Sequence, residues 1–132
     1  MKHSAVAMLA VISSVLSACS AQVEEPITAS LIWDSVECSG TEWPLAIDLT
    51  NNTGESTREV EWDFSVKLKN HSNELVHRLQ EILDAPVRST DRIIAPGETY
   101  RVCSSEPPLK EEYERSELEY TVIASATFMP ET

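Results

Sequence analysis

The sequence predicts an all-β fold, an antiparallel sandwich of six or seven strands. Apolar and polar residues alternate with a period of two through the segments 44–50, 58–69 and 118–128, and this alternation is typical of strands that bury one face. Turn-forming residues, mainly Asn, Gly and Pro, separate these segments. The chain after residue 18 is long enough for one domain with a hydrophobic core and too short for two.

The first 18 residues have the pattern of an export signal. Lys2 supplies a positive start, residues 4–15 form a short apolar run, and Ser17 and Ala18 are small residues before the predicted cut. The apolar run has about a dozen residues, fewer than the roughly 20 that a membrane-spanning helix needs. We therefore expect residues 1–18 to be removed. An ordinary secretory signal, cut near Ala18 or Ala21, also fits this pattern.

Residues 16–19, Leu16-Ser17-Ala18-Cys19, resemble the lipobox of bacterial lipoproteins. The resemblance covers the first 19 residues. It implies cleavage before Cys19, a diacylglycerol on the Cys19 sulfur, usually an N-acyl chain as well, and no other cofactor. Two or three acyl chains anchor a protein stably where one does not. Because Ser20 rather than Asp follows Cys19, the resemblance also implies an outer-membrane anchor, with the domain facing the periplasm.

The strands are expected to follow a polar tether over residues 19–27, within one domain over 28–132. The first strand is predicted over 28–38, where the alternation is weak. The second strand, over 44–50, alternates cleanly and ends at the turn residues 51–54.

The segment 58–69 has the clearest strand pattern in the chain. Every second residue is apolar, namely Val60, Trp62, Phe64, Val66 and Leu68. A helix would scatter these residues around its circumference, so the pattern predicts a strand with one buried face.

Residues 74–85 fit two structures. Their apolar residues have helical spacing, Asn73 can cap a helix, and Pro86 can end it. The neighbouring strands instead favour a hairpin partner for 58–69. We favour the strand and keep a short helix as the alternative.

The last third of the chain contains three segments. Residues 93–104 are predicted to form a strand interrupted by the turn Pro96-Gly97, and residues 105–117 an acidic loop or hairpin arm. The adjacent Pro107 and Pro108 exclude the start of this arm from a ladder. Residues 118–128 are predicted to form a long last strand.

The run from Leu45 to Val76, with the turn Asn51–Gly54 between two alternating strands, resembles small bacterial immunoglobulin- or fibronectin-like domains. Residues 94–99, before a strand, share this resemblance. Together they cover about half of the chain. The resemblance implies an immunoglobulin-like antiparallel sandwich and says nothing of function, because such sandwiches host many activities.

Cys38 and Cys103 are the two cysteines that remain if lipid modifies Cys19. In an exported protein such a pair is expected to form a disulfide. The bond would close a loop of about 65 residues, which the chain-entropy model values at about 4 kcal/mol. A reactive or metal-binding thiol pair is the alternative, although no Cys-x-x-Cys spacing occurs.

The chain is strongly acidic, with 22 acidic and 10 basic residues and a formal net charge of −12. This charge excludes nucleic acid as a partner, because phosphate binding needs clustered Lys and Arg. A cationic protein of the cell envelope would be attracted.

No catalytic or metal-binding pattern stands out. After removal of the signal the histidines are His71, expected in a surface turn, and His77, expected to pack or lie at the surface. Among the tryptophans, Trp62 is expected in the core. For Trp43, beside Pro44, we favour ordinary packing and keep an exposed aromatic anchor as the alternative.

These observations predict a non-enzymatic lipoprotein, held in the membrane through Cys19, that acts as a binding or adaptor module. Its contact surface would be the acidic surface, the arm 106–117 or a free strand edge, since strand addition is a recognised binding mode. The alternatives are an inhibitor or capture protein for a basic wall-degrading enzyme, and a passive structural lipoprotein.

Overall fold

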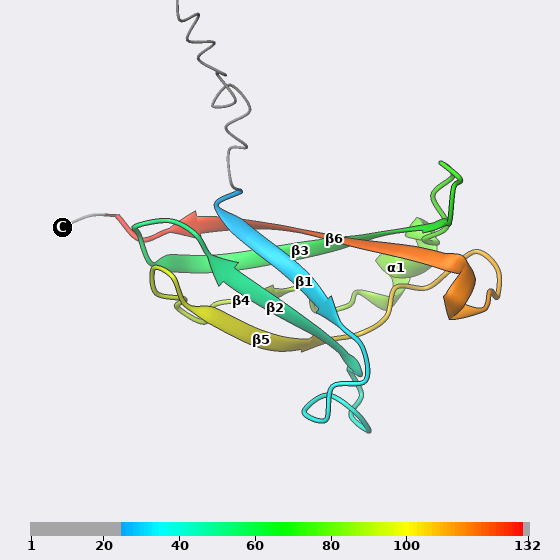
Figure 1. Ribbon diagram of the computed structural model, residues 1–132, viewed down its shortest axis with the longest axis horizontal. Helices are drawn as coiled ribbons and strands as arrows, with labels where there is room; N and C mark the ends of the chain where they lie inside the picture. Colours follow the sequence, from blue (N-terminus) through cyan, green and yellow to red (C-terminus); the bar gives the residue numbers. More distant parts are fainter. Residues whose placement is uncertain (1–24, 131–132) are drawn as a thin grey trace, which may run out of the picture.

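The computed structural model describes residues 25–130. The predicted export signal, residues 16–19 and the lipid attachment at Cys19 lie outside this range. Two three-stranded antiparallel sheets face each other across a hydrophobic core (Figure 1). The predicted all-β antiparallel sandwich is confirmed, with six strands.

One sheet has the strand order β1-β2-β5 and the other has the order β4-β3-β6. The first contains β1 (Ile27–Ile32), β2 (Leu45–Asn51) and β5 (Thr99–Ser104). The second contains β4 (Ser89–Thr90), β3 (Thr57–Leu68) and β6 (Leu118–Phe128). In the strand letters of immunoglobulin sandwiches, this order corresponds to A-B-E facing C′-C-F. No strand within residues 25–130 takes the place of strand G.

The core lies between the inner faces of β2 and β3, where the predicted alternation places large apolar side chains. Its buried members are Ile27, Leu45, Ile47, Leu49, Val60, Trp62, Phe64 and Ile94. The indole Nε1 of Trp62 donates a hydrogen bond to Ser104 Oγ of the opposite sheet, at 3.0 Å. Asn51 is also buried, and its Nδ2 donates to the carbonyls of Glu55 and Ile94. The bond from Trp62 to Ser104 thus links the two sheets, and the buried donors of Trp62 and Asn51 are paired.

Two predicted strands are shorter in the structure. The strand predicted over 28–38 ends at Ile32, because Asp34 adopts a positive φ of 57° that no regular strand allows. Of the segment 93–104, only Thr99–Ser104 pairs in a ladder. The turn at Gly97, with φ of 77°, precedes it. The predicted last strand agrees with β6 at both ends.

The strand favoured over 74–85 is wrong, and the helical alternative is correct. Helix α1 spans Arg78–Asp84. The Nδ1 atom of His77 caps it by accepting a hydrogen bond from Gln80 N–H at 3.0 Å. Ala85 ends it in the left-handed conformation. A strand has little room here, since β4 and the carbonyl of Arg88 already pair with the edge of β3.

The acidic arm, residues 105–117, folds back onto the end of the sandwich near α1. A single bridge joins Val76 to Leu109, and the N–H of Lys110 donates to the carbonyl of Leu75. A second small core forms there from Val66, Leu75, Val76 and Leu118. The arm ends in the 3-10 turn η2 (Arg115–Glu117), which leads directly into β6.

Candidate functional site

Helix α1 turns its apolar side chains to solvent. Leu79, Ile82 and Leu83 are 63%, 74% and 69% exposed, and no residue of the helix is buried. Val87, just after the helix, is 58% exposed. We call these four residues the α1 face. An ordinary surface helix turns its apolar stripe to the core, so α1 has the reverse orientation.

The polar side of α1 attaches it to β3. Arg78 Nη1 lies 3.0 Å from Asp63 Oδ1 and 2.9 Å from Glu81 Oε2. Its Nη2 lies 3.0 Å from Glu74 Oε1 and donates to the carbonyl of Phe64 at 2.7 Å. Because Arg78 is partly exposed, each ion pair contributes at most about 1 kcal/mol. Together they fix the direction in which the helix points.

A more deeply buried ion pair lies beneath the helix. The guanidinium of Arg88 pairs with the carboxylate of Glu81, and their side chains are only 9% and 12% exposed. The Arg88 Cζ also lies 4.7 Å from the centre of the Phe64 ring, a cation–π contact with the core. Burial lowers the pKa of Arg88, but a guanidinium stays charged in proteins. The pair therefore holds two opposite charges in place.

Glu74 secures the segment that leads into α1. Its Oε2 accepts hydrogen bonds from the N–H groups of Val66 at 2.8 Å and Leu75 at 3.1 Å. Burial would raise the pKa of Glu74, but these hydrogen bonds and the charge of Arg78 outweigh it and hold the pKa below its ordinary value. The ionised carboxylate is thus part of the support of the helix.

Trp43 lies beside α1 at the mouth of a cavity of about 320 Å³. Trp43 is 43% exposed, in agreement with the alternative rather than with the packing that we favoured. Trp62 lies in the core, as predicted. The other walls of the cavity come from the segment after α1, residues 84–88, and from Ser105, Glu106 and Pro108. Trp43 and the α1 face therefore belong to one side of the molecule.

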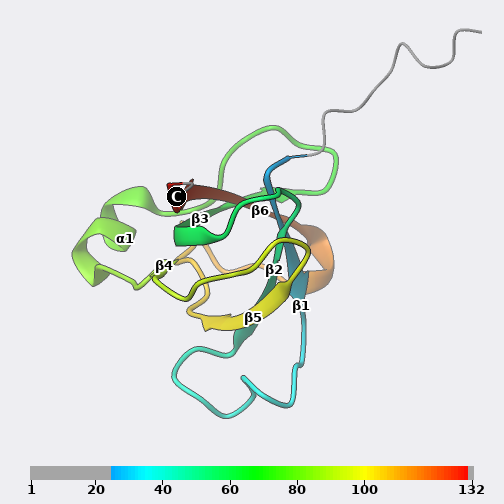
Figure 2. The same cartoon turned by 90° about the vertical axis from the view of Figure 1, so that its left-hand side faces the viewer.

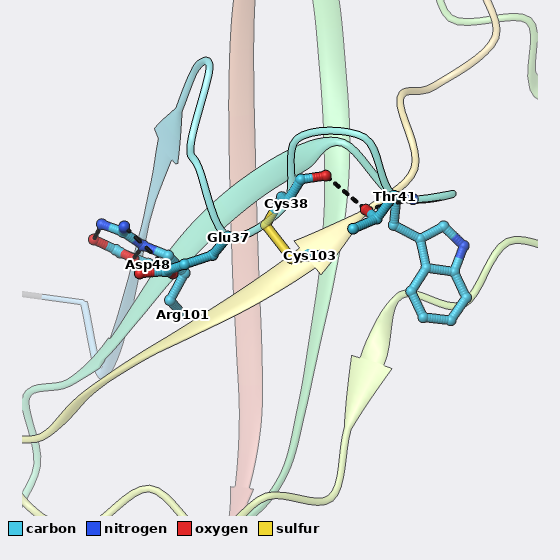
Figure 3. The surroundings of a disulfide bond; sticks show 7 residues. Glu37, Cys38, Thr41, Asp48, Arg101 and Cys103 are labelled. Atoms are coloured by element: carbon cyan, nitrogen blue, oxygen red, sulfur yellow. Dashed lines mark hydrogen bonds and ion pairs between the residues drawn. A yellow bond between two sulfur atoms is a disulfide. The ribbon is translucent and has the colours of Figure 1, made fainter.

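The predicted disulfide between Cys38 and Cys103 is confirmed, with Cα atoms 5.5 Å apart. It ties the loop between β1 and β2 to the end of β5 (Figure 3). Within this loop Thr41 Oγ1 donates to the carbonyl of Cys38 at 2.6 Å and accepts from the N–H of Trp43 at 3.2 Å. The disulfide thus supports the backbone that presents the Trp43 indole.

A second pair of charges lies next to the disulfide, as Figure 3 shows. Arg101 donates to both carboxylate oxygens of Asp48, at 2.6 and 2.9 Å. The hydrogen bond from Arg101 holds the pKa of Asp48 below its ordinary value of 3.8. Glu37, which precedes the disulfide, lies 3.6 Å from the same guanidinium.

The acidic arm borders an open cavity of about 550 Å³ whose walls include Glu106, Glu111 and Glu112. The negative charge of the arm is partly compensated, because Arg115 Nη2 lies 3.3 Å from Glu106 Oε1. The same guanidinium stacks over the ring of Trp33 at 4.1 Å. The arm is therefore anchored to the sandwich and has acidic side chains around a shallow hollow.

The histidines do not meet in a site. His71 lies exposed in the turn after β3, and His77 caps α1. Among residues 25–130, no group of three His, Cys, Asp or Glu side chains is arranged to hold a metal ion. No helix in the same range is long and apolar enough to cross a membrane.

Sequence reasoning missed the α1 face. The available signal was the spacing of Leu79, Ile82 and Leu83, but that spacing normally indicates burial. Comparisons with protein-family models, with curated proteins and with solved structures found no match for this chain.

Proposed function

We propose that this protein is a non-catalytic binding module of the bacterial cell envelope, anchored through lipid on Cys19 to the outer membrane and facing the periplasm. The anchor and location rest on the lipobox resemblance of residues 16–19. The α1 face is its contact with a partner protein. One observation carries this assignment: Leu79, Ile82 and Leu83 lie together in solvent on a helix that ion pairs hold in that orientation. Grouped apolar exposure marks interaction surfaces.

The rigid attachment of α1 favours binding. Apolar residues at positions i, i+3 and i+4 are the anchors by which helices dock into apolar grooves. A helix that is already formed and fixed does not lose conformational entropy when it binds. Arg78 binds Asp63 of β3, and Arg88 binds Glu81 of α1, so the α1 face is ready to dock without rearrangement.

The charges around the α1 face indicate the chemistry of the partner. Glu42, Asp84 and Glu106 border the cavity beside the helix, and the chain as a whole is acidic. A partner with an apolar groove rimmed by Lys and Arg would match both the apolar centre and the acidic border. Such rim charges act mainly on the rate of association, which then falls as salt is added.

The test is chemical crosslinking in cells that produce the full lipidated chain with a C-terminal tag, followed by mass spectrometry of the captured proteins. A triple variant, Leu79→Gln, Ile82→Gln and Leu83→Gln, should lose one dominant partner. Ile93→Gln is the matched control, because Ile93 is also an exposed apolar residue, at 51%. Cys19→Ala tests the anchor. A partner retained by the triple variant contradicts the assignment of the α1 face.

A second candidate function is the capture of a basic wall-degrading enzyme. The acidic side chains around the hollow of the arm, Glu106, Glu111 and Glu112, favour it. It predicts tight, salt-sensitive binding of a lysozyme that is lost when these three residues are changed to Gln. A passive structural lipoprotein would show neither partner.

A further inference from the structure

The outer edge of β6 carries unpaired backbone groups. β6 pairs with β3 on one side. The N–H of Trp62 donates to Arg88 and the carbonyl of Phe64 accepts from Arg78, so the even-numbered residues of β3 face away from β6. Because Trp62 lies opposite Ala124, the even-numbered residues of β6 also point their backbone groups away from the ladder. Between residues 120 and 128 none of these groups has a hydrogen bond to any residue of 25–130.

After Glu119, nothing in the sequence of β6 protects this edge. Residues 120–128, Tyr-Thr-Val-Ile-Ala-Ser-Ala-Thr-Phe, contain neither a charge nor a proline. Natural sheets usually protect an exposed edge with Lys, Pro, bulges or very short strands. The opposite edge of the same sheet follows that rule, because β4 has two residues. A long uncharged edge is exceptional in a chain of net charge −12.

The inner face of β6 lies close to β1, the edge strand of the opposite sheet, but is incompletely covered. Val122, Ala124, Ala126 and Phe128 pack against the core but remain partly exposed, whereas Val60, Trp62 and Phe64 of the neighbouring β3 are buried. This is the side on which strand G would pair in an immunoglobulin sandwich. An added strand would both satisfy the free backbone groups and cover these side chains.

We propose that two copies of this chain pair through β6, antiparallel about a twofold axis, and join their three-stranded sheets into one. With the axis at Ala124, Val122 of one copy lies opposite Ala126 of the other, so outward-pointing backbone groups meet. On the solvent face Thr121 meets Thr127 and Ile123 meets Ser125, without like charges in contact. Elsewhere the acidic surface repels a second copy, which favours this uncharged edge. The contact is isologous, as in most homodimers.

The β6 edge is separate from the α1 face. In the strand order β4-β3-β6, β6 lies on one side of β3, whereas Arg88, which directly precedes β4 and binds α1, lies on the other. Figure 2 shows α1 and β1 on opposite sides of the sandwich. Pairing through β6 therefore leaves the α1 face free, and the dimer does not depend on the proposed partner.

The test is density-matched sedimentation of the purified full chain in neutral detergent over a range of concentrations. We expect a dimer that dissociates on dilution. Ile123→Lys, a change on the solvent face beside the edge, should raise its dissociation constant at least about tenfold. Ala124→Pro should do the same, because it removes an outward N–H and leaves the ladder to β3 intact.

Two controls make the test specific. Val36→Lys changes another exposed apolar residue, 91% exposed in the loop after β1, and should leave the dimer unchanged. Ile82→Gln on the α1 face should also leave it unchanged. Circular dichroism verifies that the variants are folded; if Ala124→Pro is not, Ile123→Lys decides. A chain that stays monomeric at about 1 mM, or a dimer insensitive to Ile123→Lys, overturns the proposal.

Discussion

Glu81 of α1 and Arg88, which directly precedes β4, form an ion pair in which both side chains are about nine-tenths buried. This pair explains why α1 shows its apolar residues to solvent. The helix cannot rotate its apolar stripe inward without moving the Glu81 carboxylate into solvent and away from the buried Arg88 guanidinium. The ion pairs that stabilise α1 on its polar side therefore also keep the α1 face, the side proposed to bind a partner, exposed to solvent.

Removal of one member of the pair should be costly. Glu81→Gln leaves the buried Arg88 guanidinium with Asp63, whose Oδ1 lies 3.7 Å from Arg88 Nη1, as its remaining counter-charge. A buried charge left with no partner costs about 3–5 kcal/mol, so the loss here should be smaller, about 1–3 kcal/mol. Thermal unfolding followed by circular dichroism should show a fall in Tm of about 5 °C or more. Asp84→Asn, at the exposed end of the helix, is the control and should leave Tm nearly unchanged. Equal Tm values for the two variants would refute a stabilising role of the pair.

Opening of the disulfide should loosen the Trp43 loop. In Cys38→Ser/Cys103→Ser the closed loop is lost, and the chain-entropy model expects a loss of up to about 4 kcal/mol in the free energy of unfolding. Urea unfolding measures this loss. The emission of Trp43 should also shift, because Thr41 no longer holds its backbone against a fixed Cys38. Comparison with Trp43→Phe in the same background separates this signal from those of the other tryptophans.

Acid should destabilise the fold through two carboxylates. The pKa of Asp48 is lowered by its hydrogen bond with Arg101, and that of Glu74 is lowered despite burial by backbone hydrogen bonds. A carboxyl group whose pKa is lower in the folded state contributes stability above its unfolded pKa, and this contribution is lost as the pH falls through the folded value. The free energy of unfolding should therefore decrease below about pH 5.

Asp48→Asn provides the test of this pH dependence, since it removes one of the two groups. The variant should show a shallower decrease between neutral and acid pH than the unaltered protein. Parallel curves would mean that Asp48 titrates alike in the folded and unfolded chain.

The strands were predictable where one face is buried along the whole element. The alternation of apolar and polar residues in 58–69 and 118–128 indicates which side chains enter the core. The structure has both strands at nearly these bounds. The loop with Asp34 was not predictable, because its positive φ depends on a local turn that the alternation does not record. The disulfide was predictable because only two cysteines follow Cys19 in the sequence.

The orientation of α1 could not be predicted from the residues of the helix itself. The spacing of Leu79, Ile82 and Leu83 indicates a helix with one apolar side, but that side faces solvent only because Asp63 and Arg88 bind the polar side. Those partners come from segments on either side of the helix, and their positions depend on the pairing of β3 with β4. The spacing of these residues therefore indicates which of them share a side of the helix but not what that side faces.

The α1 face should be dispensable for folding and necessary for binding. Leu79→Gln, Ile82→Gln and Leu83→Gln replace exposed side chains with a good helix former, so each should change the free energy of unfolding by no more than about 0.5 kcal/mol. Val76→Ala, at a fully buried position of the second core, should lose about 1–3 kcal/mol by the same urea assay. Only the α1 variants should lose the crosslinked partner in cells. If folded Val76→Ala also lost the crosslinked partner, the partner would depend on the whole end of the sandwich and not on the α1 face alone. If the α1 variants unfolded the domain, their side chains would support the fold rather than bind a partner.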